Sequence, residues 1–416
     1  MLLFVFGKHL LWTHTNADGG STSYYYDDAI TWIVLGIALL WLIYFLVNSY
    51  LRTRALRRQS HGNRRVPRRI IKRKRELSSR YLRPGFSNTI HAIGIGRLPS
   101  NNNYCIQVFV SDANQQWAVA AGAMLLPPMY GGVPVVMIEM PVAEFLAAAI
   151  DEPAVQSLPY QNDMRQHQEV ILGGLSGANT NLTGENGTIG YFCTRKSRLS
   201  RRKEIHLLSN SHVFADLRRS NVDESDLIMQ PSPGEATSTR PIGSLVNFSA
   251  LRFADVNHPN QIDAAIARLW TTCAHKFVIP LIGAVKGYVL KADVDVGETA
   301  RKFGRTTGYT EGRVFSVYLD IWVRYSRTGQ SAFFQNQFLI EPDSTQFRKF
   351  VEKGDSGSLV VDAKQNALGL IFGGMTKLPE SLQSNSAVNN VKRVDSYGVA
   401  NPISEVLDRL KIELLL

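Results

Sequence analysis

Three side chains have the types that nucleophilic catalysis needs, and each lies at the boundary of a short apolar segment. His212 lies in the turn of the segment 205–215, after its apolar strand, Asp263 opens an apolar run, and Ser356 lies in a glycine-rich turn. A serine hydroxyl is a weak nucleophile until a neighbouring base, usually an imidazole, takes its proton. The imidazole needs a carboxylate that orients it and stabilises the charge it acquires. Together the three residues fit acyl transfer.

Each of these residues also has an ordinary structural explanation when it is taken alone. A histidine in an apolar strand, such as His206, is usually part of the core, and an aspartate before a strand is usually a turn residue. A serine between glycines usually belongs to a loop. Several other aspartates compete for the role of Asp263, namely Asp216, Asp223, Asp226 and Asp255. The joint arrangement of the three segments favours a catalytic triad.

Taken in the order His, Asp, Ser, the three segments resemble the chymotrypsin-like serine peptidases. More narrowly, several motifs resemble the trypsin-like peptidases of the plant narrow-leaf type and their microbial relatives. The likeness covers roughly residues 172–410, and residues 88–140 are weakly similar to the amino-terminal module of that group. The motifs are LLSNSHVFA (207–215), IMQPSPGE (228–235), QIDAAIARL (261–269), KFGRTTGYTEGRV (302–314), KGDSGSLVV (353–361) and LGLIFGG (368–374).

The resemblance implies a role for each residue of the triad. Ser356 would be the nucleophile, His212 the general base and Asp263 the acid that orients the imidazole. The backbone N–H groups of Gly354 and Ser356 would form the oxyanion hole. This chemistry needs no metal and no organic cofactor, and none is expected.

The resemblance also indicates where a substrate would bind. The strand around Phe372, Gly373 and Gly374 would pair with the substrate backbone by strand addition. Phe350 falls where the family has the base of its primary pocket. An aromatic side chain there lacks the carboxylate that would select Lys or Arg.

Asp355, directly before the nucleophile, needs a cation that the sequence does not identify. Residues 171–174 (ILGG) look like the new amino terminus that zymogen cleavage produces, and such a terminus would pair with Asp355. Another cation elsewhere in the chain remains an alternative.

The positive charge of the chain is concentrated in one segment. The formal net charge is +11, but residues 52–83 hold 14 Lys and Arg and one acid, Glu76. We interpret this segment as a solvated linker that sets membrane topology, with contact to anionic lipid headgroups as an alternative. Nucleic-acid binding is disfavoured, because neither interleaved aromatics nor a known fold accompanies the charge. The three cysteines are too few for a disulfide framework and lack zinc spacing, namely Cys105, Cys193 and Cys273.

An uncharged apolar stretch precedes the basic segment. Residues 29–47 contain no charged side chain, and as a helix they would span about 28 Å, close to the hydrocarbon core of a bilayer. A buried core helix is the alternative, although such a helix normally keeps a polar face. The positive-inside rule places residues 52–416 in the cytoplasm. The sequons at Asn181, Asn186 and Asn247 would then stay unmodified.

The pattern of short apolar strands predicts a mainly β fold, a chymotrypsin-like double β-barrel preceded by a small α/β module and one N-terminal transmembrane helix. A hairpin is expected from 313–325 and 332–340, and a closing helix with Asn401 as N-cap and Pro402 at its first position. The expected order is an extracytoplasmic segment (1–28), the transmembrane helix (29–48), a basic juxtamembrane linker (49–83), the α/β module (84–168) and a trypsin-like peptidase domain (169–416).

The sequence therefore predicts a membrane-anchored serine endopeptidase that acts on protein or peptide substrates through an acyl-enzyme on Ser356. The main alternative is a catalytically silent barrel that binds peptides or partner proteins as a membrane-tethered scaffold. The oligomeric state stays open.

Overall fold

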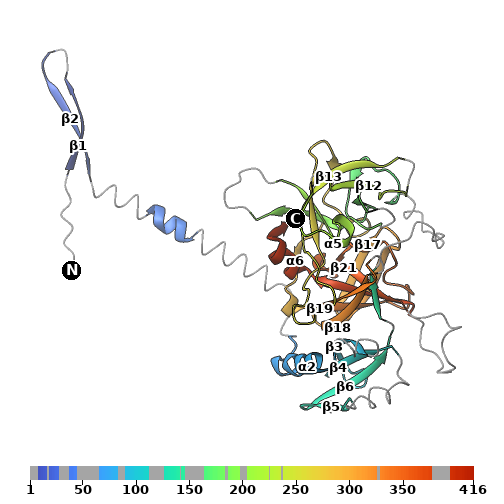
Figure 1. Ribbon diagram of the computed structural model, residues 1–416. Coiled ribbons are helices and arrows are strands. Elements are labelled where there is room, and N and C mark those ends of the chain that lie inside the picture. Colours follow the sequence, from blue (N-terminus) through green and yellow to red (C-terminus); the bar gives the residue numbers. More distant parts are fainter. Residues whose placement is uncertain are drawn as a thin grey trace. The chain divides into compact units, whose positions relative to one another are not determined.

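The structure is a computed structural model, and it describes only part of the chain. The described residues are 8–15, 18–27, 37–44, 65–82, 90–111, 126–140, 142–145, 164–182, 186–196, 204–223, 225–235, 238–325, 328–376 and 394–416. They form two compact units, Met1–Gly62 and Asn63–Leu416. The second unit is mainly β with few helices, which agrees with the mainly β part of the predicted fold class (Figure 1).

The first unit contains a hairpin and a short helical stretch. Strands β1 (Lys8–Thr15) and β2 (Ser21–Asp27) pair antiparallel. Of the transmembrane helix predicted at 29–48, only 37–44 belongs to the described residues; this stretch is helical and its apolar side chains are exposed. Within the described parts of the chain, no helix combines the length and apolar character needed to cross a bilayer.

The second unit begins its barrel-like part with a seven-stranded sheet that carries two of the candidate site segments. Its strand order is β23-β10-β11-β14-β13-β12-β9. Inward-facing Leu, Ile, Ala and Phe side chains form its core cluster. The strands are β9 (Ala178–Asn179), β10 (Tyr191–Arg195), β11 (His206–Ser209), β12 (Leu227–Gln230), β13 (Arg240–Phe248), β14 (Ala265–Leu269) and β23 (Ile412–Leu414).

The second unit also contains a larger, twelve-stranded sheet, and six of its strands close into a ring. The order is β17-β20-β21-β22-β19-β18, and β17 pairs with β18 as well as with β20. The hairpin predicted from the sequence is confirmed, since β18 and β19 pair antiparallel. The strands are β17 (Thr299–Gly304), β18 (Gly308–Tyr325), β19 (Gln330–Pro342), β20 (Leu359–Val361), β21 (Asn366–Thr376) and β22 (Ser396–Pro402).

Residues within the expected α/β module extend this larger sheet. Strand β3 (Ile90–Arg97) pairs with β18, and β4 (Tyr104–Val110), β6 (Val133–Glu139) and β5 (Met129–Tyr130) continue outward from it. Shorter elements complete the described fold: β7 (Ala143–Phe145), β8 (Val170–Ile171), β15 (Ala274–His275), β16 (Gly287–Tyr288), the 3-10 turn η2 (Lys291–Asp293) and helix α5 (Ser211–Phe214).

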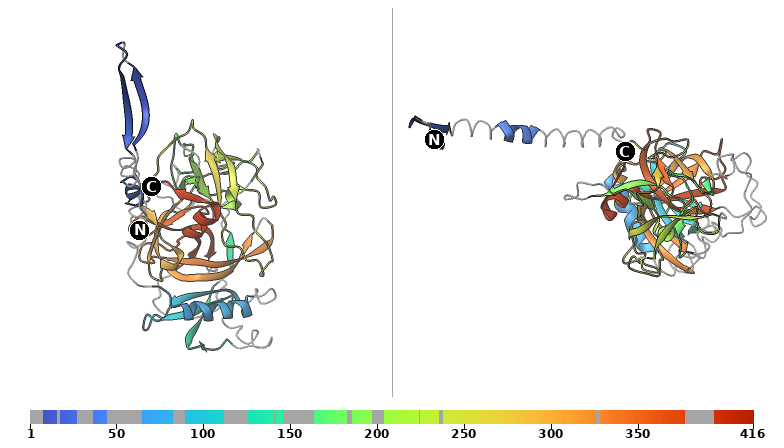
Figure 2. Two further views of the ribbon diagram at one scale, coloured as in Figure 1. Left: turned by 90° about the vertical axis from the view of Figure 1, so that its left-hand side faces the viewer. Right: turned by 90° about the horizontal axis from the view of Figure 1, so that it is seen from above.

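The prediction of a plain linker over 49–83 is wrong at its carboxyl end. Residues Arg68–Tyr81 form helix α2, which packs beside β3 and β4 (Figures 1 and 2). Ile70, Leu77 and Tyr81 recur at helical spacing and are buried in the core of this sheet. The high density of charge hid this stripe, because Lys74 also lies on it. Its Nζ is 2.5 Å from Oδ1 of Asp320 on β18, and both side chains are buried.

The closing helix α6 (Ile403–Leu410) appears where the sequence predicts it. Its apolar face, Ile403, Val406, Leu407 and Leu410, is buried as expected. The predicted cap is wrong, however, because Pro402 is the N-cap residue and no side chain caps the helix. Asn401 instead contacts the backbone of Asp263.

Removal of the Lys74 ammonium should leave the Asp320 carboxylate buried without its cation. We expect Lys74→Ala to lower the free energy of unfolding by about 3–5 kcal/mol. The exposed Lys72, in the same helix, provides a matched control, and Lys72→Ala should change it by less than about 0.5 kcal/mol. Urea unfolding followed by circular dichroism measures both. Equal losses in the two variants would contradict the packing of α2.

Candidate active site

The Asp263 carboxylate holds both the ring and the backbone of the histidine segment. Its Oδ2 lies 2.5 Å from Nδ1 of His212, and its Oδ1 accepts hydrogen bonds from the N–H groups of Ser211 at 2.7 Å and His212 at 3.3 Å. The side chains of His212 and Asp263 are almost completely buried. With Nδ1 directed at a carboxylate, the other ring nitrogen is left for proton transfer.

Neighbouring elements fix the peptide backbone around Asp263. Asn210 donates from Nδ2 to the carbonyl oxygen of Asp263 at 2.7 Å. Asn401, at the end of β22, accepts from the N–H of Asp263 at 3.0 Å and donates to its carbonyl at 3.1 Å. The aspartate is therefore connected to both sheets.

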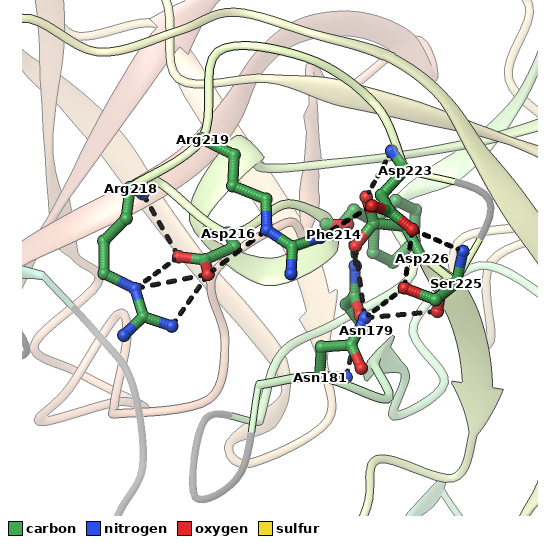
Figure 3. Close-up of polar contacts among 9 residues, drawn as sticks. All are labelled: Asn179, Asn181, Phe214, Asp216, Arg218, Arg219, Asp223, Ser225 and Asp226. Carbon is green, nitrogen blue, oxygen red and sulfur yellow. Dashed lines mark hydrogen bonds and ion pairs between the residues drawn. The ribbon is translucent and has the colours of Figure 1, made fainter.

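The competing aspartates have other partners, and three of them appear in Figure 3. Asp216 is paired with Arg218 at 2.7 Å, and Asp223 accepts hydrogen bonds from Ser225. Asp255 pairs with His258 at 2.9 Å. Of the five candidate aspartates, Asp263 is the one that the structure brings to His212.

Asp226 instead supports the short helix that carries His212. It accepts a hydrogen bond at 2.8 Å from Nδ2 of Asn179, which also donates to the carbonyl of Phe214 at 2.8 Å (Figure 3). Phe214 is the last residue of α5. This contact ties the end of α5 to strand β9.

Tyr325 is a site residue that the sequence reasoning missed. Its hydroxyl donates to Oδ2 of Asp263 at 2.9 Å, and its ring centroid lies 6.1 Å from that of His212 in an edge-to-face arrangement. Burial, and then the charge of Asp263, raises the pKa of Tyr325 well above its ordinary value. The phenol therefore stays protonated and donates. In the sequence, Tyr325 is simply the last aromatic residue of an apolar strand, so no local pattern distinguishes it.

Ser356 lies in a tight turn that only glycines allow. Gly354 and Gly357 adopt left-handed backbone conformations, with φ of 96° and 95°. A side chain on Gly357 would also collide with the carbonyl of Thr188. The N–H of Thr188 donates to the Ser356 carbonyl at 2.8 Å, and its hydroxyl donates to the Gly354 carbonyl at 2.9 Å. Thr188 thus positions the turn on both sides of the serine.

The Ser356 side chain is buried, and its Oγ makes no hydrogen bond to any residue that the structure describes. The predicted link between Ser356 and His212 is therefore not formed in this state. Catalytic hydrogen bonds are often loose without substrate and tighten when it binds. Among the described residues, the N–H groups of Gly354 and Ser356 donate to no backbone carbonyl.

Lys302 is the cation that the sequence could not assign to Asp355. Its Nζ lies 3.1 Å from Oδ2 of Asp355, and both side chains are completely buried. Thr307 adds a hydroxyl donor at 2.7 Å and a backbone N–H donor at 3.1 Å. Burial alone would raise the pKa of Asp355, but Lys302 and these donors hold it below its ordinary value. Ile171, the first residue of the ILGG motif, lies instead in β8, paired with β15.

The predicted substrate-binding residues lie in two different environments. Phe372 is buried and packs on Phe334, with ring centroids 4.7 Å apart, while Gly373 and Gly374 pair with strand β7. Phe350 is buried in the core of the larger sheet, with Nζ of Lys302 at 5.9 Å from its ring centroid. Its role at a primary pocket stays a prediction.

The described residues offer no group of three or more His, Cys, Asp and Glu side chains arranged to hold a metal ion. The three cysteines are buried free thiols, and burial raises the pKa of Cys105 to about 11.

A family model described as the Nal1 C-terminal domain matches residues 265–416 of this chain. No curated protein matches this chain. Solved serine proteases show low similarity, and three of them align with 59% of this chain. Thermobifida fusca protease A is 16% identical and aligned over 98% of its length, with a TM-score of 0.36. Cellulomonas bogoriensis chymotrypsin is 15% identical over 98% of its length, with a TM-score of 0.35. Nocardiopsis protease is 17% identical over 99% of its length, with a TM-score of 0.36.

The Lys302–Asp355 pair should be essential for the stability of the serine turn. Lys302→Met removes the charge while keeping most of the side-chain volume, and we expect a loss of about 3–5 kcal/mol in the free energy of unfolding. Lys349→Met provides a matched control, because Lys349 pairs with Glu352 near the surface and should contribute less than about 1 kcal/mol. Urea denaturation measures both. A Lys302→Met variant as stable as the control would show that Asp355 does not depend on this cation.

Proposed function

We propose that this protein is a serine endopeptidase that cleaves peptide bonds with Ser356 as nucleophile. One observation carries the proposal: a buried carboxylate, Asp263, lies 2.5 Å from Nδ1 of His212. An aspartate so placed fixes the imidazole tautomer and stabilises the imidazolium that a general base becomes. Acyl transfer needs such a His–Asp pair together with a serine, and Ser356 in its glycine-framed turn is the serine that we assign to it.

In the proposed reaction, Oγ of Ser356 attacks the substrate carbonyl carbon while His212 takes the hydroxyl proton. The carbonyl oxygen becomes an oxyanion, which the N–H groups of Gly354 and Ser356 stabilise. His212 then gives its proton to the departing amine as the C–N bond breaks, leaving an ester on Ser356. Water repeats the sequence, and the carboxylic acid leaves as Oγ regains its proton. Asp263 and Tyr325 keep their protonation states throughout.

The alternative function is a catalytically silent scaffold that binds peptides. The specific observation in its favour is the buried Oγ of Ser356, which makes no hydrogen bond to any described residue. A silent scaffold would keep the same fold and the same His212–Asp263 contact, so reactivity of the serine separates the two functions.

We further propose that residues 29–48 anchor the protein in a membrane, with the catalytic part on the cytoplasmic side. The support comes from the sequence, from an uncharged stretch followed directly by the basic residues of 52–83. If Asn181, Asn186 or Asn247 were found glycosylated in cells, this topology would be wrong. Contact between the basic residues and anionic lipid is part of the same proposal.

The triad proposal predicts that Ser356 reacts with a fluorophosphonate probe. We expect labelling of the wild-type protein, no labelling of Ser356→Ala, and a loss of at least about 100-fold in labelling rate for His212→Ala, because general-base assistance contributes about 10²–10⁴-fold. Ser220→Ala, at an exposed serine, is the matched control and should label like the wild type. In-gel fluorescence measures the rates. Labelling that survives in Ser356→Ala would place the reactive serine elsewhere.

A further inference from the structure

The edge of β21 that the resemblance assigns to substrate is already paired with the protein's own chain. Strand β7 runs antiparallel to β21, with Phe145 opposite Gly373 and Glu144 opposite Gly374. On its other side, β7 runs parallel to β18, with Ala143 opposite Val323 and Glu144 opposite Arg324. Three residues of extended backbone are thus held by two strands at once.

The barrel does not need β7 for its closure. The six-stranded ring closes through the pairing of β17 with β18, and β7 lies off that path. The carbonyl oxygen of Glu144 also approaches Gly373 closely, at 3.3 Å from the position of an added Cβ. A glycine in a strand often marks such a close approach of another backbone. Strand β7 therefore contacts β21 in the way that the backbone of a bound peptide would.

Both strands that hold β7 lead directly to the candidate active site. In β18, the residue after Arg324 is Tyr325, whose hydroxyl contacts Asp263. In β21, the residue before Gly373 is Phe372, and Phe372 packs on Phe334, which stacks on Tyr325 with ring centroids 6.5 Å apart. A strand bound between β18 and β21 thus lies beside the residues that orient His212.

The surroundings of β7 define which side chains fit in the groove between β18 and β21. Ala143 is completely buried and belongs to the core cluster that includes Val323 and Phe372. Glu144 is exposed. A larger residue at the position of Ala143 would overpack the core, whereas the exposed position of Glu144 sets no limit on side-chain size. The groove therefore selects by backbone pairing and by one small residue.

We propose that the groove between β18 and β21 is the binding site for an extended peptide substrate with a small side chain at the position of Ala143, and that β7 must leave it before substrate binds. The inference rests on the proposed function, because it assigns this groove to the same peptide-bond chemistry. Strand β7 is then a built-in competitor for the site.

The test uses the full chain in the Ser356→Ala background, so that binding is measured without turnover. The probe is a fluorescent peptide with the sequence VAEFLA, that of residues 142–147. Glu144→Pro removes a backbone N–H donor from β7, and we expect it to increase probe affinity at least about tenfold. Glu144→Ala, which keeps the backbone donor, is the matched control and should bind like the parent. A probe with Trp in place of its alanine, VWEFLA, should bind at least about tenfold more weakly.

Ala143→Trp provides a second route, because the bulky side chain cannot remain buried and should expel β7. Affinity for VAEFLA should rise as in Glu144→Pro. Hydrogen exchange supplies the third readout without any change in β7: amide exchange at 142–145 in the Ser356→Ala protein should accelerate when the probe binds.

The inference is overturned if folded Glu144→Pro and Ala143→Trp bind the probe no more tightly than the parent. It is also overturned if the bound probe leaves exchange at 142–145 unchanged. These outcomes differ from failure of the proposed function, which is read from fluorophosphonate labelling of the protein with Ser356 intact. Tighter binding to Glu144→Pro without any labelling of Ser356 would retain the groove and remove the catalysis.

Discussion

The buried carboxylate of Asp263 is the group on which the candidate site depends. An ionised carboxylate inside a protein is stable only when hydrogen bonds and opposite charge compensate its desolvation. Asp263 obtains these contacts from Ser211 and His212, which follow β11 of the seven-stranded sheet, and from Tyr325 at the end of β18 in the larger sheet. Asn401 of β22 holds its backbone. Because these partners come from both sheets, the site can assemble only when the two sheets are packed together.

Two buried ion pairs fix other elements of the same unit. Lys302–Asp355 stabilises the turn that presents Ser356, and it does so without a new amino terminus. Lys74–Asp320 attaches helix α2 to β18, the strand that ends at Tyr325. Removing one partner of such a pair lowers the free energy of unfolding more than replacing both partners with apolar residues does. The reason is that the remaining charge stays buried without a partner. The chain therefore fixes its serine turn and helix α2 by the same kind of contact, a buried ion pair.

The sequence predicted those parts of the fold and site that depend on local pattern. Glycines around Ser356, the hairpin of β18 and β19 and the apolar face of α6 can be recognised from neighbouring residues. Tyr325 and Asn401 could not be recognised, because they lie 62 and 138 residues from Asp263, their partner. Helix α2 was missed for a different reason, since Lys74 on its buried face concealed the apolar stripe. The occupation of β21 by β7 is likewise a tertiary contact that no local spacing encodes.

The hydrogen bond from Nδ1 of His212 to Asp263 can be measured without any assay of activity. Proton NMR of protein with ¹⁵N-labelled histidine should show a far-downfield resonance coupled to Nδ1 of His212, because this N–H donates to a buried carboxylate. We expect this resonance in the wild type and in Ser356→Ala, and its loss in Asp263→Asn. A wild-type spectrum without the resonance, or an unchanged spectrum in Asp263→Asn, would show that Asp263 does not hold this proton.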